Sequence, residues 1–600
     1  MSLKAWYTFN NNYKNQGIGD LDLAVSTSPS YVNGKFGKAL STGGFTWTAE
    51  QTASILNNEA LSICFWIYVV DGSDRKIIFG NDSLAANNNR KFAIFQYPTE
   101  NDLHLYWMND TANTSLLSGS VVSGAFPTGQ WTHCAITYSN PTCKIYINGV
   151  LKETWTGTSN SSTFAYKTQV VHSSSSRYMN DMRFYDHCLS AKEVKEISKG
   201  LILHYPLSSP YETGMKNIYS GTAAKGNATG HDDNWTITKL ADEPGYNYKY
   251  SYTGTGSNRW TNFNFGNFSF TAGKKYYYSC KVRCRSANFI MDLRASRNHN
   301  DYFPGVSIVG GVLNNKDGEW HEYYASQTIN STFSDYSGGT ITSNPVLEFY
   351  SENLNTSGKV YTADFDIKDV QVIESNEYVP FIDNTMVTTA VSDCSGYGNN
   401  GTRSGTLSYS PSSPRYDGCF EFSGSQFIKD ASTRWQAGSI NDITISVWVK
   451  PNAVDCGGVG GIMYDVADHN ATCISLYNTQ WQFLKRSDIT WLNISNGGNT
   501  VGQWTHHACT LKDGVAKVYK DGSLISTTTV GAIITEMTSN TFFCIGCDFP
   551  GGHEYMNGSI SDFRIYATAL SDADIKQLYN SPISVDKSGN LYCNEFKEGL

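Results

Sequence analysis

The 600-residue sequence predicts an all-β protein built from β-sandwiches. Segments rich in Ile, Val, Thr, Tyr and Trp alternate with period two, as half-buried strands do. Asn-Gly at 148–149 and Asp-Gly at 521–522 lie between such segments, and both dipeptides favour the type I′ turn of a β-hairpin. Helical patterns are confined to short stretches, so the strands are expected to bury their apolar faces in two-sheet sandwiches or jelly rolls.

Repeated sequence blocks indicate a duplicated domain, because three of them recur in the same order. Each copy ends in a short helix. Ser190 and Glu193 form a capping box in the first copy, and Ser571 and Asp574 occupy the same place in the second. The matched blocks are 61–68 with 443–450, 129–137 with 502–510, and 178–190 with 561–571.

The second copy is interrupted by a long insertion. Residues 201–207 look like the first strand of a new copy, yet the remaining blocks of that copy begin only near residue 386. Long insertions are tolerated in exposed loops because they add little loop-closure entropy. The predicted units are a first jelly roll at 1–200, a second at 201–209 and 381–582, an inserted β-sandwich at 210–380, and a short tail at 583–600.

The composition argues against several classes of protein. Aromatic residues make up 14% of the chain and charged residues 16%, which supplies ample apolar surface for folded cores. The net charge is −9 and no Lys/Arg cluster stands out, so we expect no nucleic-acid partner. No stretch reaches 18 uninterrupted apolar residues, so no membrane insertion is expected. The apolar run near the start is too short for a signal peptide, which favours synthesis in a host cytoplasm.

The repeated blocks resemble LamG-like jelly rolls of the concanavalin A-like lectin/glucanase superfamily. The matching features are Trp66 and Trp448, Gly-Gln-Trp-Thr-His at 129–133 and 502–506, the hairpin turns, and the Arg-Phe/Ile-Tyr…Leu-Ser endings. The insert is similar to galactose-binding-like carbohydrate-binding modules. The whole arrangement resembles multi-domain tail or fibre proteins of bacteriophages. The resemblance implies two concanavalin A-like jelly-roll sandwiches with an inserted carbohydrate-binding-module-like domain.

Candidate sugar-binding residues lie in polar, loop-like stretches of the insert. Exposed rings with a few oriented polar groups are what a sugar site requires. The alternative is that the same rings anchor loops or fill the core. The candidates are Trp235, Arg259, Trp260, Asp301 and Tyr302. By contrast, Trp131 and Trp504 open a central strand, where we expect each ring to fill the core.

One loop suggests calcium. The segment 393–401 resembles the Asp-x-Ser-Gly-x-Gly-Asn loop found near the start of such jelly rolls. A hard cation takes carboxylate and carbonyl oxygens at a tight turn, so Asp393, Asn399 and Asp562 are the candidate ligands. The alternative is an Asx turn in which Asp393 bonds to its own loop.

Catalysis is not expected. Glycosidases need a pair of appropriately spaced carboxylates, which the glucanase branch of the resembled superfamily takes from an alternating Glu-x-Asp-x-Glu strand. The nearest acidic clusters are Glu348 with Glu352, and Asp364 with Asp366, where Lys368 replaces the third acid.

The sequence therefore predicts a non-enzymatic glycan-binding component of a bacteriophage virion, in the tail or a fibre, that adheres to the host surface. Its expected partners are a host cell-surface glycan, other virion proteins and further copies of the chain in a homo-oligomer. One alternative is a purely structural virion decoration or scaffold protein without sugar binding. Another is a bacterial glycan-binding adhesin.

Overall fold

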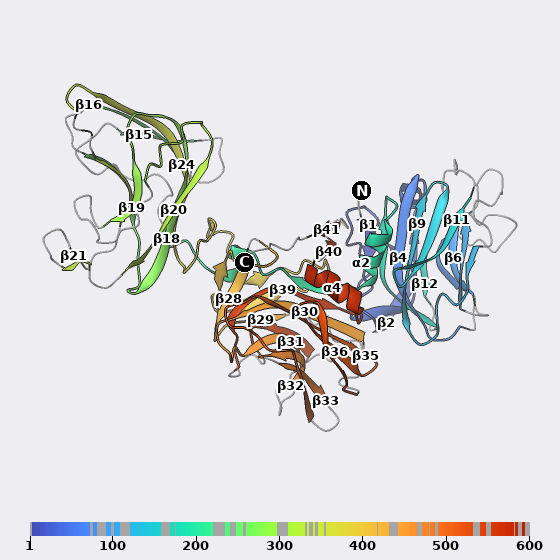
Figure 1. The fold of residues 1–600 in the computed structure, drawn as a ribbon. Coiled ribbons are helices and arrows are strands. Elements are labelled where there is room, and N and C mark those ends of the chain that lie inside the picture. The colour runs from blue at the N-terminus through green and yellow to red at the C-terminus, as the bar shows by residue number, and fades with distance from the viewer. Residues whose placement is uncertain are drawn as a thin grey trace.

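The computed structural model shows three domains, with the second jelly roll lying between the insert and the first jelly roll (Figure 1). It describes residues 3–72, 76–80, 92–97, 101–107, 120–157, 168–173, 176–219, 235–240, 248–255, 260–296, 310–329, 333–334, 340–341, 346–352, 354, 356–416, 418–430, 442–464, 471–478, 480–485, 490–531, 541–547, 554–580, 583–585 and 591–593.

The first jelly roll (residues 3–200) is an antiparallel sheet wrapped around one core. Its elements are β1 (Leu3–Tyr7), β2 (Ala24–Asn33), β3 (Lys38–Trp47), α1 (Ala49–Leu56), β4 (Ala60–Val69), β5 (Lys76–Gly80), β6 (Phe92–Tyr97), β7 (Asp102–Trp107), β8 (Ser120–Val122), β9 (Trp131–Ser139), β10 (Thr142–Ile147), β11 (Val150–Thr156), β12 (Thr168–Ser173), β13 (Arg177–Tyr185) and α2 (Ala191–Ser198). The strand order is β11-β10-β9-β4-β13-β3-β12-β5-β6-β7-β8, with β1 on β13 and β2 on β3. Phe65, Trp107 and Ile136 lie in the core.

The second jelly roll (residues 201–209 and 381–580) has two sheets facing each other. Its elements are β14 (Leu201–Tyr205), β25 (Ala390–Val391), β26 (Gly401–Ser404), β27 (Ser408–Ser410), β28 (Cys419–Ser423), β29 (Phe427–Asp430), β30 (Asp442–Pro451), β31 (Gly458–Tyr464), β32 (Ala471–Tyr477), β33 (Gln480–Lys485), β34 (Thr490–Ser495), β35 (Thr505–Lys512), β36 (Val515–Lys520), β37 (Ser523–Thr529), β38 (Thr541–Ile545), β39 (Asn557–Tyr566) and α4 (Asp572–Asn580). One sheet runs β27-β28-β39-β30-β35-β36-β37 and the other β25-β26-β29-β38-β31-β32-β33-β34. Because β14 pairs with β39, the strand before the insert belongs to this domain.

The insert is a sandwich of a larger and a smaller sheet. Its elements are α3 (Pro210–Thr213), β15 (Trp235–Lys239), β16 (Tyr248–Thr255), β17 (Trp260–Asn267), β18 (Lys274–Ala287), β19 (Asp292–Ser296), β20 (His321–Ile329), β21 (Phe333–Ser334), β22 (Thr340–Ile341), β23 (Val346–Glu352) and β24 (Val360–Glu374). The sheets β15-β16-β24-β18-β20 and β17-β23-β19 share a core that includes Tyr250, Phe349 and Phe365. In the tail, β40 (Ile583–Val585) pairs with β41 (Leu591–Cys593).

Local sequence signals account for the turns and helix starts. Asn148 and Gly149, like Asp521 and Gly522, have positive φ at both turn positions, as a type I′ hairpin requires. The Ser190 side chain accepts from the backbone N–H of Glu193, whose carboxylate accepts from the Ser190 N–H in return. The all-β fold class predicted from the period-two pattern is thus confirmed. Within the described ranges, no helix is long and apolar enough to cross a membrane.

Candidate functional site

The loop at 393–400, which we define as the Asp393 loop, joins the two jelly rolls. The Asp393 carboxylate accepts from the backbone N–H of Ser395 at 2.9 Å, of Asn399 at 2.9 Å and of His204 at 3.0 Å, and from the Ser395 hydroxyl at 2.7 Å. These bonds form the Asx-type turn that was the alternative to calcium. The buried carboxylate therefore shapes the loop and fastens it to β14.

This loop places Tyr397 against the first jelly roll. The Tyr397 ring meets Trp6 edge-on at 5.1 Å between centroids and Phe36 at 5.6 Å. Its hydroxyl accepts from the Arg183 guanidinium at 3.4 Å. Burial raises the pKa of the Tyr397 hydroxyl well above its usual value. The Asp393 loop is thus a docking element between two domains.

Gly396 offers a test of this docking. It has φ +90, and a Cβ there would lie 2.8 Å from the Trp6 ring. We expect Gly396→Ala to weaken the docking by about 1–2 kcal/mol, because both the left-handed backbone and the close approach favour glycine. Calorimetry is expected to show the unfolding transitions of the two jelly rolls moving apart. Gly405→Ala, also at positive φ and on the same domain but facing Gln426, is the control; an equal effect there would contradict the docking role.

The Asp562 carboxylate, another predicted calcium ligand, is contacted by side chains of the second jelly roll. Its carboxylate accepts from Arg564 at 2.7 Å and Tyr416 at 3.2 Å, and lies 3.0 Å from the His204 ring. Asn399 is turned away, donating its amide to the Ile202 carbonyl. Hydrogen-bond donors thus contact both the Asp393 and the Asp562 carboxylate, and calcium binding by Asp393, Asn399 and Asp562 stays a prediction. In the described part of the chain, no group of three His, Cys, Asp or Glu side chains is arranged to hold a metal.

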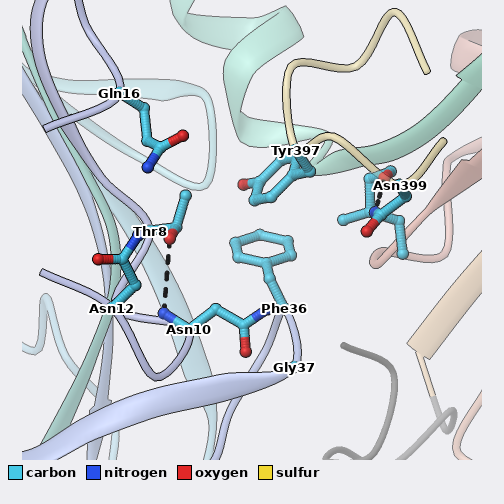
Figure 2. Close-up of a pocket in the computed structure, with 9 residues that line it drawn as sticks. Thr8, Asn10, Asn12, Gln16, Phe36, Gly37, Tyr397 and Asn399 are labelled. Carbon is cyan, nitrogen blue, oxygen red and sulfur yellow. Dashed lines mark hydrogen bonds between the residues drawn. The ribbon is translucent and has the colours of Figure 1, made fainter. Parts of the chain in front are cut away.

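A small cavity lies beside the docked ring, with a volume of about 80 Å³, roughly the room that six water molecules need. Figure 2 shows the Phe36 and Tyr397 rings next to each other, with amide and hydroxyl side chains on the facing segment. The side-chain amide oxygen of Asn10 accepts a hydrogen bond from the Lys38 backbone N–H at 2.8 Å, which fixes this side chain beside the cavity. The cavity is lined by Thr8, Asn10, Asn12, Gln16, Phe36, Gly37, Ile202, Tyr397 and Asn399.

A larger cleft separates the same two domains on the other side of Gly37 and Ile202, which line both spaces. Its volume of about 530 Å³ lies in the range of small-ligand pockets, about 300–1,000 Å³. The wall from the first jelly roll carries Trp66, Tyr68 and Trp131. Rings beside polar groups are the combination that carbohydrate recognition requires. The cleft is therefore our candidate site.

Charged side chains in the cleft are arranged in pairs across the domain boundary. Lys35 lies 2.9 Å from Asp442, and its Nζ stands 5.0 Å from the centre of the Trp66 ring. Lys195 lies 3.4 Å from Asp574. These contacts fix the two walls relative to each other and leave the cleft nearly balanced in charge.

Comparisons with known proteins agree with this architecture. A family model described as the concanavalin A-like lectin/glucanases superfamily matches residues 41–195 and 423–576, just over half of the chain. The chain belongs to the concanavalin A-like lectin/glucanase superfamily. Both matched segments lie in the jelly rolls, which are therefore lectin-type domains.

Individual superfamily relatives are more distant. Adhesion G-protein coupled receptor V1 from Danio rerio is 29% identical over 177 residues, which span 26% of this chain and only 3% of the receptor. Domain 4 of AbnA, an extracellular arabinanase from Geobacillus stearothermophilus solved with arabinotriose, is 23% identical over 32% of this chain and 92% of its own, with a TM-score of 0.26. The binding domain of botulinum neurotoxin DC, in complex with SialylT, is 15% identical over 64% of this chain and 97% of its own, with a TM-score of 0.25.

Of the five sugar-binding residues predicted in the insert, only the side chain of Trp235 lies among the described residues. Trp235 is half-buried, packs 4.8 Å from Tyr252, and donates its indole N–H to Thr261. Trp260 begins β17 opposite Glu352, and its side chain is not among those described. Arg259, Asp301 and Tyr302 lie outside the described residues. These contacts hold the Trp235 ring in place, and sugar binding by the five residues stays a prediction.

Three of the acidic side chains considered for catalysis, Glu348, Asp364 and Asp366, are paired with arginine. Glu348 is buried and accepts from Arg294 at 2.8 Å. Asp364 and Asp366 share the Arg285 guanidinium, at 2.6 and 2.7 Å. The hydrogen bond from Arg285 lowers the pKa of the Asp364 carboxyl. Carboxylates held in this way are unsuited to act as general acids at neutral pH.

The cleft itself was missed at the level of sequence. We expected Trp131 to fill the core; its side chain is half-buried, packs against the core cluster that contains Trp66, and lies 5.5 Å from Tyr68. His133, two residues on, is fully buried. The available signal was the second copy, in which Lys450 replaces Tyr68.

Proposed function

We propose that this chain is a non-enzymatic, glycan-binding adhesion protein that serves in the tail or a fibre of a bacteriophage virion. The observation that carries the proposal is the cleft between two lectin-type jelly rolls, lined by aromatic rings and polar groups. Rings contact the apolar faces of sugars, and amides, hydroxyls and charged groups bond to their hydroxyls. The arginine-paired carboxylates support the absence of catalysis.

Adhesion would follow from many weak contacts. A shallow site on one copy binds a sugar weakly, and several copies on one particle raise the effective concentration of the remaining sites. The proposal therefore includes a homo-oligomer, contacts with other virion proteins, and a host cell-surface glycan as the ligand.

A purely structural virion role has its own support. β11 and β37 lie at the ends of their sheets in the described part of the chain. Val150 and Leu151 on β11, with Leu524 and Ile525 on β37, expose about half of their surfaces. An open edge with exposed apolar side chains is suited to strand pairing with a neighbouring protein.

A glycan array of the full chain, with calcium and with EDTA, separates these functions. We expect binding to one glycan class, unchanged by EDTA, because backbone and hydroxyl donors already occupy Asp393. Loss of binding in EDTA would reinstate a calcium site. If a folded, oligomeric sample bound no glycan on the array, the result would contradict glycan binding and favour the structural role.

A further inference from the structure

The two jelly rolls differ at the face that borders the cleft. In the first, three rings stand side by side across β9, β4 and β13: Trp131 opposite Tyr68, and Tyr68 opposite Tyr178. Their centroids are 5.5 and 5.7 Å apart, and each ring is partly exposed. We call them the ring row.

The second jelly roll lacks the ring row. Lys450 and Ser559 form the cross-strand pair equivalent to Tyr68 and Tyr178, and of the three rings only the equivalent of Trp131, Trp504, remains. Trp504 donates its indole N–H to the Ser412 carbonyl at 3.2 Å, which ties it to its own domain. The duplicated scaffold therefore presents three neighbouring, partly exposed rings in one copy only.

The terminal helices of the two jelly rolls also differ at this face. In α4, Tyr579 stacks on Trp448 at 5.6 Å and 18° and so covers the face of the second jelly roll. In α2, Ser198 holds the equivalent position and lines the cleft. The structure itself supports the equivalence of Ser198 and Tyr579. Each lies against the glycine of its own domain's hairpin turn: Ser198 against Gly149, and Tyr579 against Gly522. The small serine leaves open the space that tyrosine fills.

We infer that the ring row and the cleft beside it form the glycan site of this protein, that the second jelly roll supplies the opposite wall without a site of its own, and that the ligand is an uncharged glycan. The inference rests on the proposed function and deepens it. Aromatic rings supply the apolar contact area of such a site, and the polar groups beside them can bond to sugar hydroxyls.

The charges of the cleft point to the same ligand class. Lys35 is engaged by Asp442, Lys195 by Asp574, and Lys199 by Glu196 at 2.7 Å. The remaining exposed pair, Lys512 and Asp513, is of opposite sign. An acidic sugar that approached Lys35, Lys195 or Lys199 would have to displace a carboxylate, whereas hydroxyls can bond to the paired groups as they stand.

The test uses the full chain on an array that carries neutral hexose and N-acetylhexosamine oligosaccharides beside sialylated, sulfated and uronate-containing ones. Tyr68→Ala is expected to weaken binding to neutral probes roughly tenfold through loss of ring contact. Lys450→Ala, the matched change in the second jelly roll, is expected to leave binding unchanged. Ser198→Tyr, which copies Tyr579, is expected to abolish binding while all three rings remain.

The outcomes separate the inference from the proposed function. If the wild type binds no glycan, the proposed function fails. If it binds but Tyr68→Ala and Ser198→Tyr bind equally well, or if only acidic probes bind, the function stands and this inference is overturned. Because Ser198 is itself largely buried, circular dichroism of each variant accompanies the array. Tyr68→Ala, at a half-exposed site, keeps the test decisive if Ser198→Tyr does not fold.

Discussion

Acidification from pH 6.5 to pH 5 is expected to destabilise the second jelly roll more than the first, by on the order of 2 kcal/mol for each additional buried imidazole. His506 and His507 are both buried in β35, and burial lowers the pKa of each ring to about 3 from an ordinary 6.5. In the first jelly roll, His133 has the same lowered pKa of about 3, but Cys134 stands where the second copy has His507.

The sign follows from proton binding. A buried ring whose pKa is lowered stays neutral in the folded protein, while the unfolded chain takes up a proton near pH 6.5. The stabilisation is therefore complete above pH 6.5 and is lost as the pH falls toward 3. After burial, the neighbouring His506 and Lys520 lower the pKa of His507 further, because both disfavour a positive charge on its ring. His204, also buried with a lowered pKa, adds a further contribution on β14.

His507→Cys is the decisive variant, because it installs the residue of the first copy. We expect it to reduce the pH dependence of the second jelly roll between pH 6.5 and 5 by one imidazole's contribution, on the order of 2 kcal/mol, and to leave the first unchanged. His506 and His204 keep the remainder. Hydrogen exchange of β35 and β9 amides at several pH values measures both domains in one sample. His321→Gln, at a partly exposed ring in the insert, is the control. An unchanged slope in His507→Cys would contradict the assignment.

The fold could be read from the sequence because its signals are local and occur twice. Period-two strands, Asn148-Gly149 and Asp521-Gly522, and the capped helix starts each depend on a few neighbouring residues. The duplication also exposed the interruption, since β14 has a sequence counterpart in β1.

The site was less accessible to sequence reasoning, because it depends on contacts between distant segments. Tyr397 contacts Trp6, almost 400 residues away in the sequence, and no local sequence pattern predicts that contact. Asp393 shows a second limit: the same Asp-x-Ser-Gly loop suits a cation or its own N–H groups, and the sequence does not show which donors surround the carboxylate. Trp235 shows a third limit. Its polar neighbours in the sequence suggested an exposed ring, but the pairing of β15 with β16 places the ring against Tyr252.

Asp562→Asn is expected to reduce the stability of the second jelly roll by about 3–5 kcal/mol, the effect of removing one partner from a buried ion pair. Arg564 is fully buried and lies 2.7 Å from Asp562, so the variant leaves a guanidinium without a countercharge. The backbone is not the cause, because Asp562 has φ 51 and asparagine adopts that conformation readily. Urea unfolding followed by exchange of β39 amides measures the loss.

Two comparisons identify the buried charge as the reason for that loss. Lys274→Met removes an exposed pair with Glu374 and is expected to change stability by less than about 1 kcal/mol. In acid, the difference between Asp562→Asn and the wild type is expected to shrink. The nearby Arg564 and His204 hold the pKa of the Asp562 carboxyl far below its ordinary 3.8, against the effect of burial, so its stabilisation is present above pH 4 and is lost as the pH falls. If the stability difference between Asp562→Asn and the wild type stayed constant down to pH 2, the loss of stability would come from packing. If the difference narrows, the loss comes from the ion pair.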